Sequence, residues 1–198
     1  MTTRRLADLA ADIRAQPGPV RLVGIDGCGG AGKTTFATHL GNALGGVQII
    51  HTDDFASHDE PTEWWPRMLH DVIDPLLRGE SASYHPYDWV RRRFADTPIA
   101  VEPAAVILVE GVGATRRAWR DQLAMCIWVD CPRALRLARG IERDGEELRE
   151  FWHHWMTAED AYVADERPFA AADVIVDGAS PSPAEGEYVE LLGLTAPR

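Results

Sequence analysis

Five short apolar runs divide the chain, and none of them alternates between apolar and polar positions. Such a run of Val, Ile and Leu is typical of a β-strand that is covered on both faces. Between the runs, apolar residues recur every three or four positions, which indicates helices. The strands are expected at residues 20–25, 47–50, 105–109, 125–129 and 173–176, and the helices at 33–43, 63–77, 133–143 and 146–164.

Strands and helices that alternate along a chain predict a mainly parallel sheet with helices on both faces. We therefore expect an α/β fold, a three-layer α/β/α sandwich around a mainly five-stranded parallel sheet. The 198 residues suffice for one such domain and are too few for two comfortable ones. Residues 1–198 are thus expected to form a single domain, in which the small, acidic segment 181–198 is a loosely packed tail.

The charge balance narrows the range of partners. The chain has 20 Lys and Arg against 31 Asp and Glu, a formal net charge of -11. Such a surface repels a phosphate backbone, so we expect no nucleic-acid partner. No apolar run could span a bilayer, and the amphipathic residues 1–16 lack the core of a signal peptide. Three cysteines suit reduced thiols, so we expect a cytoplasmic protein without a membrane partner.

The segment GCGGAGKT at residues 27–34 fits the pattern G-x-x-x-x-G-K-[ST] in full. Its glycines let the backbone curl so that N–H groups point at phosphate oxygens, and the positive end of the following helix favours the same anion. In such a loop Lys33 reaches the β- and γ-phosphates, and the Thr34 hydroxyl coordinates magnesium. The sequence therefore predicts the cofactors ATP and Mg²⁺, held by Gly27, Gly29, Gly30, Ala31, Gly32, Lys33, Thr34 and Thr35.

GTPases, motor-like ATPases and kinases all use a phosphate-binding loop of this kind. A GTPase should carry Asn-Lys-x-Asp for guanine, and the chain has no such segment. An oligomeric ATPase would normally be longer. The remaining features favour a kinase that acts on a small molecule.

Acidic residues close two of the predicted strands. Asp53 and Asp54 follow the second run, where a carboxylate can take the proton of an attacking hydroxyl or orient that hydroxyl. Asp53 is our choice of base and Asp54 the second, although both could instead cap the next segment. Glu110 closes the third run in the manner of a Walker B acid, since a buried glutamate without such a task would be costly. The expected metal ligands are Thr34, Asp53 and Glu110.

Six segments in order along residues 20–177 resemble the uridine kinase family of P-loop kinases, which is related to phosphoribulokinase and pantothenate kinase. They are GIDGCGGAGKTT, TDDF, YHPYDWVRRR, VEGV, RLARGIERD and ADVIV. The P-loop is shared with many families, whereas the Asp-x-Phe and Pro-Tyr-Asp segments are more discriminating. The resemblance implies ATP-dependent transfer of the γ-phosphoryl group to a hydroxyl of a small metabolite, with a nucleoside such as uridine or cytidine as the first expectation.

The resemblance also implies roles for single residues. Asp53 matches the family's catalytic aspartate, and Asp59 matches an acid that holds the ribose hydroxyls. Tyr87 matches an aromatic residue that contacts the nucleobase, and Arg143 matches a lid-side arginine at the ribose and phosphates.

The chain departs from the family at two positions. Arg92 stands where similar uridine kinases carry a base-reading histidine, and Gly140 stands where they carry an arginine. The first departure leaves pyrimidine recognition open, so a sugar, a vitamin precursor or a nucleoside analogue is an alternative acceptor. The second weakens the phosphate clamp.

Four arginines recur at three- and four-residue spacing in the helix expected at 133–143, so they share one side of it. Beside an ATP site such a stripe favours a helical lid, because guanidinium groups stay charged and bind phosphate in a bidentate manner. A solvated face paired with nearby acids is the alternative. Catalytic roles are expected for Lys33, Asp53, Arg139 and Arg143, cofactor contacts also for Arg136 and Arg139, and substrate contacts for Asp53, Asp59, Tyr87, Arg92 and Arg143.

Two questions stay open at the level of sequence. Residues Arg91 to Arg93 bind an anionic group of the acceptor or lie in solvent, and a homo-oligomer is compatible with the chain. A nucleotide-binding regulator with little kinase activity is a second class of function. An aspartate on the acceptor side argues against it, because a protein that only binds nucleotide has no need of one.

Overall fold

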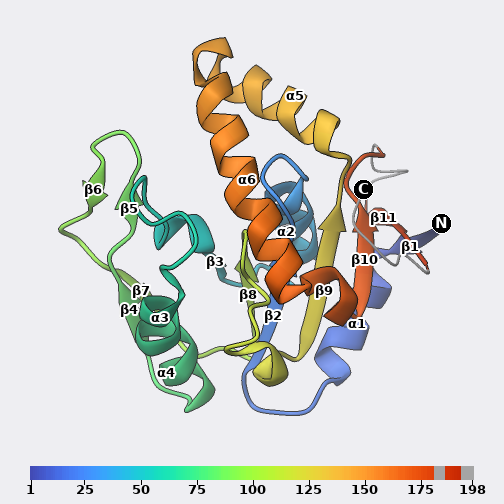
Figure 1. Cartoon of the computed structure of the whole chain (residues 1–198). Helices are drawn as coiled ribbons and strands as arrows, with labels where there is room; N and C mark the ends of the chain where they lie inside the picture. Colours follow the sequence, from blue (N-terminus) through green and yellow to red (C-terminus); the bar gives the residue numbers. More distant parts are fainter. Residues whose placement is uncertain (181–185, 193–198) are drawn as a thin grey trace.

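The computed structural model describes residues 1–180 and 186–192 (Figure 1). Seven strands form one sheet in the order β1-β11-β10-β9-β2-β8-β3. In this order the five strands from β10 to β3 pair in parallel with their neighbours, and they coincide with the five predicted runs. The predicted α/β architecture is therefore confirmed. These strands are β2 (Arg21–Asp26), β3 (Ile49–His51), β8 (Val106–Glu110), β9 (Met125–Asp130) and β10 (Val174–Asp177).

The hydrophobic pattern does not predict the two antiparallel strands at the other edge. β1 (Thr2–Arg5) pairs with β11 (Glu187–Glu190), which continues the sheet from β10. Both strands are mostly polar, so they leave no apolar run in the sequence. Residues 187–190 belong to the segment expected to be a loosely packed tail, and here the structure differs because these residues complete the sheet. Residues 181–185 and 193–198 of that segment lie outside the described residues.

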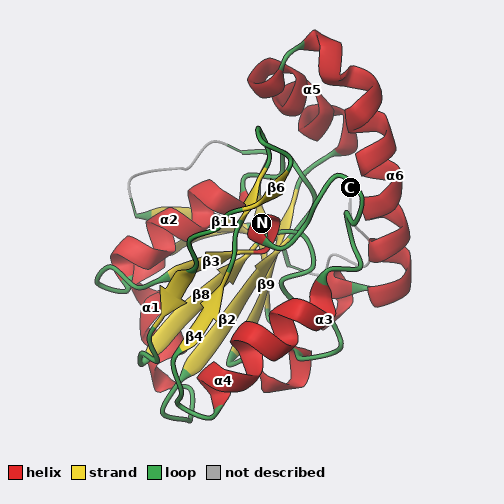
Figure 2. Ribbon diagram, turned by 90° about the vertical axis from the view of Figure 1, so that its left-hand side faces the viewer, coloured by secondary structure: helices red, strands yellow, loops and turns green. Residues whose placement is uncertain are grey.

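Helices cover both faces of the sheet (Figure 2). α1 (Leu6–Ala15) and α2 (Lys33–Ala43) pack on one face, and α3 (Trp65–Met68), α4 (Asp74–Leu77) and α6 (Arg149–Glu166) lie over the other. Successive side chains of a strand point to opposite faces. In β8, accordingly, Leu108 joins the core under α1 and α2 while Ile107 and Val109 join the core under α3 and α4. A strand that is covered on both faces therefore shows a continuous apolar run rather than an alternating pattern.

The helix expected at 63–77 is interrupted. Between α3 and α4 the backbone forms a π-helical turn at Leu69–Ile73. Pro75 in the first turn of α4 has no N–H to donate, and its ring disfavours a regular turn before it. The proline therefore gives a physical reason for the irregular turn.

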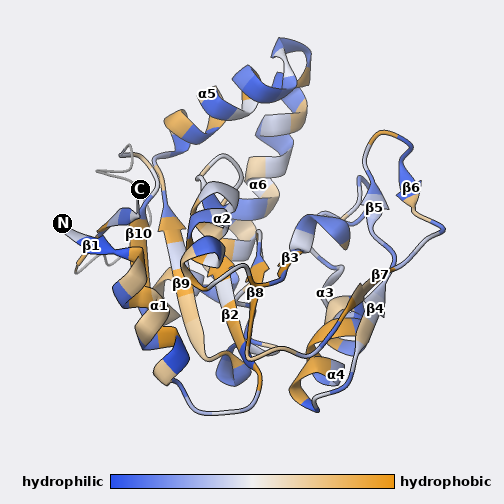
Figure 3. Cartoon of the chain, turned by 180° about the vertical axis from the view of Figure 1, so that it is seen from behind, coloured by the Kyte–Doolittle hydropathy of each residue, from blue (hydrophilic) through white to orange (hydrophobic). Residues whose placement is uncertain are grey.

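Two parts of the chain extend beyond the carboxyl ends of the parallel strands (Figure 1). One is the pair of α5 (Arg133–Asp144) and α6, joined through a 3-10 turn at Glu146–Leu148. The other is the hairpin of β5 (Tyr87–Asp88) and β6 (Arg93–Phe94), which lies in the chain between the paired strands β4 (Ala82–Tyr84) and β7 (Ile99–Val101). Figure 3 shows that α5 is largely hydrophilic, unlike the central strands. Shorter 3-10 turns lie at Thr52–Asp54, Arg120–Gln122 and Pro168–Ala171.

Across residues 1–180 and 186–192, no helix combines the length and the apolar character that crossing a membrane requires.

Candidate functional site

A cavity of about 660 Å³ lies at the carboxyl ends of the parallel strands, below α5 and α6. Ligands of open α/β sheets bind at this edge, because the loops that follow the strands meet there. The structure brings most of the predicted site residues to its wall. They are Gly29, Gly30, Gly32, Lys33, Thr34, Thr35, Asp53, Glu110, Arg139 and Arg143.

The phosphate-binding loop joins β2 to α2, as the sequence predicts. Gly30 and Gly32 have φ values of 76° and 99°, a conformation that other residues rarely adopt. α2 begins at Lys33, whose ammonium group is buried and donates a hydrogen bond to the carbonyl of Cys28 at 3.1 Å. The free N–H groups at the start of α2 and the charge of Lys33 make this end of the cavity attractive to an anion.

Asp26, directly before the loop, is fully buried and was not singled out by the sequence analysis. Its carboxylate accepts hydrogen bonds from the N–H of Gly27 at 2.7 Å and of Gly113 at 3.1 Å, and from the hydroxyl of Tyr162 at 2.6 Å. Thr115 adds two more through its N–H and its hydroxyl. Asp26 thereby ties the start of the phosphate-binding loop to the segment after β8 and to α6.

Glu110, at the end of β8, links two predicted metal ligands. Its Oε1 accepts a hydrogen bond from the Thr34 hydroxyl at 3.1 Å, and its Oε2 lies 2.7 Å from Nδ1 of His51. Burial alone would raise the pKa of Glu110, but the His51 hydrogen bond and the charge of Lys33 outweigh burial and lower it. The same hydrogen bond raises the pKa of His51. Glu110 is thus held as a carboxylate beside Thr34.

Asp53 faces the cavity, whereas Asp54 does not line it. The Asp54 carboxylate accepts a hydrogen bond from the hydroxyl of Tyr84 at 2.8 Å. Desolvation by the surrounding protein raises the pKa of Asp53, although the charge of Lys33 opposes this effect. The position of Asp53 therefore supports its choice over Asp54 as the residue that meets an acceptor.

The arginines of α5 do not all line the cavity. Arg139 lines the cavity and donates to the carbonyls of Gly30 at 3.3 Å and Gly178 at 2.8 Å. Arg143 also lines it, and its pairing with Asp144 at 2.7 Å raises the pKa of Arg143.

Arg136 is placed differently from its predicted contact with the cofactor. Its guanidinium is buried outside the cavity wall, where it contacts the Cys131 carbonyl at 3.1 Å and Glu159 of α6 at 3.2 Å. Glu159 also accepts hydrogen bonds from the N–H of Gly29 at 2.7 Å and from the indole of Trp155 at 3.0 Å. Arg136 faces α6 because a buried glutamate needs charged and polar partners. Its role in the structure is to join α5, α6 and the loop.

Gly140 has a packing reason in this chain. A Cβ atom at this position would overlap with the indole ring of Trp152, which packs directly on the α5 backbone. The same ring contacts the phosphate-binding loop at Gly29, and its N–H donates to Asp144 at 3.0 Å. The Trp152 ring, which lines the cavity, therefore fills the space that the family's arginine would need at position 140.

The predicted acceptor residues Asp59, Tyr87 and Arg92 do not line the cavity. Asp59 and Arg92 are exposed, and Arg92 has a φ of 54° in the turn of the β5–β6 hairpin. Tyr87 is buried behind His58, with its hydroxyl 3.0 Å from Nδ1 of that histidine.

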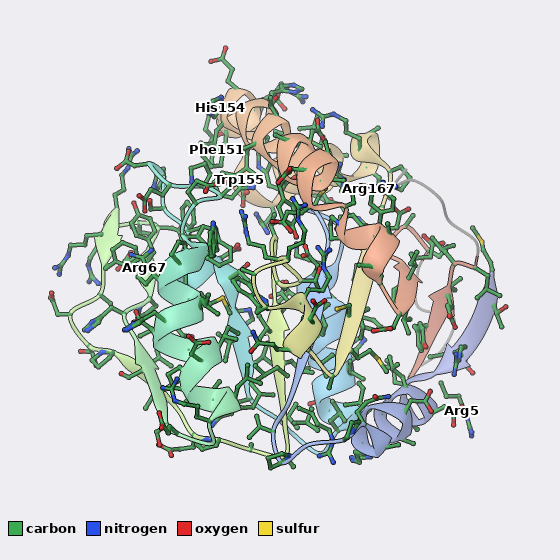
Figure 4. The ribbon with its side chains drawn as sticks, turned by 60° about the horizontal axis from the view of Figure 1, so that its bottom comes forward. Arg5, Arg67, Phe151, His154, Trp155 and Arg167 are labelled. Atoms are coloured by element: carbon green, nitrogen blue, oxygen red, sulfur yellow. The ribbon has the colours of Figure 1, made fainter. Side chains whose placement is uncertain are left out.

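An aromatic group that the sequence analysis missed forms the end of the cavity away from the phosphate-binding loop. His58 lies between Trp89 of the hairpin, at a ring-centroid distance of 5.0 Å, and Phe151 of α6, at 6.2 Å. Trp155 stands one turn from Phe151 on the side of α6 toward the hairpin (Figure 4). The four-residue spacing of Phe151 and Trp155 was the sequence signal for a shared face. The unpredicted lining residues are His58, Trp89, Val112, Gly140, Asp144, Leu148, Phe151, Trp152 and Trp155.

Known proteins resemble the chain in both sequence and structure, although no family model matches it. It is 32% identical to a uridine kinase of Halobacterium salinarum over 150 residues, which is 66% of this chain and 67% of that protein. It is 28% identical to a uridine kinase of Staphylococcus haemolyticus over 143 residues, 64% and 69% of the two chains.

Two solved structures share the fold. A possible uridine kinase from Bacillus stearothermophilus superposes with a TM-score of 0.64 at 24% identity, over 86% of this chain and 96% of that one. A putative fructose transport system kinase from a Silicibacter species gives a TM-score of 0.57 at 23% identity, over 87% and 95%.

Proposed function

This chain belongs to the uridine kinase-like family and is a kinase-type transferase, and from this premise we propose that it transfers the γ-phosphoryl group of ATP to a hydroxyl of a nucleoside such as uridine or cytidine. The observation that carries the proposal is the floor of the cavity. There Lys33, Thr34, Asp53 and Glu110 come together from three different strand ends. Such a set serves both a triphosphate and an acceptor hydroxyl.

The residues present fit magnesium bound together with a nucleotide. Within the described residues no group of three His, Cys, Asp or Glu side chains could hold a metal by itself. Magnesium sites in kinases do not need one, because one or two carboxylates act together with substrate phosphates. Thr34 and Glu110, which are in contact, would hold the ion with Asp53 nearby. When bound, the ion would neutralise charge on the phosphates.

The protein side chains supply the rest of the chemistry. Lys33 and the N–H groups of the loop hold the phosphates, and Asp53 orients the acceptor hydroxyl and takes its proton. Arg139 and Arg143 reach the cavity from α5, where guanidinium groups stabilise negative charge that develops on transfer. Closure of α5 and α6 over the cavity would exclude water, which competes as an acceptor.

A second cavity, of about 390 Å³, supports the binding of a whole nucleotide. It shares Gly32, Thr35 and Arg139 with the first and continues between α2 and the segment after β10, past His39 and Gly178. A nucleotide whose phosphates occupy the loop has its nucleoside part next to the loop, and this cavity offers that space.

The surroundings of the arginines in the β5–β6 hairpin bear on the choice among alternative acceptors. Arg91 pairs with Asp88 at 3.0 Å and Arg93 with Asp96 at 3.1 Å, and neither lines the cavity. These two arginines therefore give no reason to expect an acceptor that already carries a phosphate, and an uncharged sugar stays an alternative. The name of the Silicibacter kinase gives a reason to test fructose. Cytoplasmic location and a homo-oligomer stay predictions.

The test is coupled ADP release with magnesium-ATP over a panel of acceptors: uridine, cytidine, purine nucleosides, pantothenate, ribose and fructose. We expect turnover with a pyrimidine nucleoside and its loss in Lys33→Ala and Asp53→Asn. Turnover with another acceptor alone would retain the kinase and reject the nucleoside. No acceptor-dependent ADP release at all would favour a regulatory nucleotide-binding protein.

A further inference from the structure

We propose that His58 determines which acceptor this kinase takes, by holding the polar edge of a planar heterocyclic ring through its Nε2 atom. The inference rests on the proposed function in that it names the group that reads the acceptor of the same site. The ligand class is a nucleoside whose ring carries a carbonyl group on its edge. Uridine is the probe of this class.

The shape of the cavity away from the phosphate-binding loop suits a flat, apolar body. Aromatic side chains from three segments converge there, namely His58 after β3, Trp89 of the hairpin, and Phe151 with Trp155 of α6. Aromatic rings favour stacked or edge-to-face contacts with another ring. A planar nucleobase satisfies this geometry.

Exposed apolar side chains mark the same end. Leu148 and Phe151 are 40% and 36% exposed, and both line the cavity. Large apolar side chains grouped at the wall of a cavity indicate a surface that a ligand covers. A ring placed among them would remove this surface from water.

The orientation of His58 is fixed from behind. Its Nδ1 lies 3.0 Å from the hydroxyl of Tyr87, a buried residue that does not itself line the cavity. A phenol hydroxyl donates more readily than it accepts, so we assign Nδ1 as the acceptor and place the proton of the neutral ring on Nε2. Among the described residues, the hydrogen bonds of His58 engage only Nδ1. Nε2–H is therefore a donor available to a carbonyl oxygen.

The surroundings keep the imidazole neutral. Burial, together with the charge of Arg92 and against that of Asp59, lowers the pKa of His58 below its usual value. Tyr87, Trp89 and Phe151, the other groups that face it, carry no charge at neutral pH. A neutral reading group suits an uncharged ring and gives no advantage to an anionic acceptor.

Tyr87 follows as a positioning residue. It acts through His58 because its hydroxyl holds the imidazole. If so, Tyr87→Phe and His58→Phe should not be additive, since the second change removes the group that the first one positions.

The experiment is calorimetric titration of uridine and of ribose into the full chain, with magnesium and a non-hydrolysable ATP analogue. His58→Phe keeps a ring and removes the hydrogen bond, and we expect it to weaken uridine binding about tenfold while ribose binding stays the same. His58→Gln, whose amide N–H reaches about as far as Nε2, should recover part of the loss. His154→Phe, at an exposed position of α6 outside the cavity (Figure 4), is the matched control and should bind as the wild type does.

A second measurement needs no variant. Diethyl pyrocarbonate acylates neutral imidazole, and the modified peptides are counted by mass spectrometry. Saturating uridine should protect His58 and leave His154 unchanged. Equal modification of His58 with and without uridine, or unchanged uridine binding by His58→Phe, would overturn the inference while acceptor turnover still supports the kinase. Uridine binding at His58 without any ADP release would instead reject the proposed function and retain the reading role.

Discussion

Two neighbouring aspartates illustrate how a shift of one residue decides a role. Asp53 faces the cavity, whereas Asp54 accepts a hydrogen bond from Tyr84 behind it. The 3-10 turn at Thr52–Asp54 turns successive side chains to different sides, which separates them. Sequence alone can favour one of two adjacent acids, but it does not show which one the turn directs into the site.

The first prediction compares the substitution of Asp53 with that of Asp54. Asp53→Asn should lower kcat about 10²- to 10⁴-fold, because an amide cannot accept the proton of the attacking hydroxyl. The KM for ATP should change little, since Lys33 and the loop remain. Asp54→Asn, which keeps an acceptor for Tyr84, should retain most of kcat. Steady-state kinetics with the best acceptor measures both, and equal losses in the two variants would contradict the assignment of Asp53.

At the scale of elements, α5 and α6 form a unit held by one buried ion pair. Arg136 and Glu159 are 6% and 2% exposed and lie 3.2 Å apart. Glu159 extends the unit to the phosphate-binding loop through the N–H of Gly29. Removing one partner of such a pair leaves a buried charge without compensation.

We therefore predict that Arg136→Met lowers the free energy of unfolding by about 3–5 kcal/mol. The double variant Arg136→Met/Glu159→Met should recover much of that loss, since no charge stays buried. Urea unfolding at neutral pH measures both. A single variant as stable as the wild type would show that the pair does not hold the unit together.

The same pair gives a pH dependence. Burial raises the pKa of Glu159 in the folded state above its unfolded value. Between the two pKa values the folded state binds more protons, so the unfolding free energy falls as pH rises through that window. Without the opposing charge of Arg136 the window widens upward. Arg136→Met should therefore lose stability with rising pH over a wider range than the wild type does, as measured by urea unfolding at a series of pH values.

The contact between Gly140 of α5 and Trp152 of α6 leads to a prediction about how the two helices pack. A Cβ at position 140 would overlap with the indole, so Gly140→Ala should lower the unfolding free energy by about 1–3 kcal/mol despite the higher helix propensity of alanine. In a Trp152→Leu background the change Gly140→Ala should cost less, because the ring that the new Cβ would meet is gone. An increase in stability for Gly140→Ala alone would mean that α6 packs elsewhere.

The sequence predicts the elements well where burial is two-sided and poorly where it is not. Strands β2, β8 and β9 are apolar up to their acidic last residues, apart from Arg21 at the start of β2, because helices cover both faces, and their runs are plain in the sequence. β1, at the edge of the sheet, and its neighbour β11 contain few apolar residues and pair between opposite ends of the chain, so no local pattern marks them. Likewise, Pro75 warns of a break in the helix but does not show that the break becomes a π turn.

The site residues, too, can be predicted only where a local sequence pattern marks them. The phosphate-binding loop is contiguous, so its residues can be predicted from one motif. The acceptor end is assembled by the fold from segments far apart in the chain, which bring His58, Trp89 and Phe151 together. The resemblance points to Tyr87 there, yet the structure puts Tyr87 behind His58.

At the scale of the whole molecule, we propose that the cavity between the sheet edge and the α5–α6 unit holds a triphosphate at the loop and a nucleoside at the aromatic end. Asp26 supports this arrangement, because it connects the loop, the segment after β8 and α6 from a fully buried position. The parts of the chain that we propose to hold donor and acceptor thus belong to one hydrogen-bonded frame.

The most direct test follows the fate of the transferred group. The protein is mixed in excess with ATP labelled at the γ-phosphate, magnesium and uridine or cytidine, and the products are separated after a single turnover. We predict label in the nucleoside monophosphate, and none there for Asp53→Asn. Label that appears only as inorganic phosphate, or stays in ATP with every nucleoside, would contradict it.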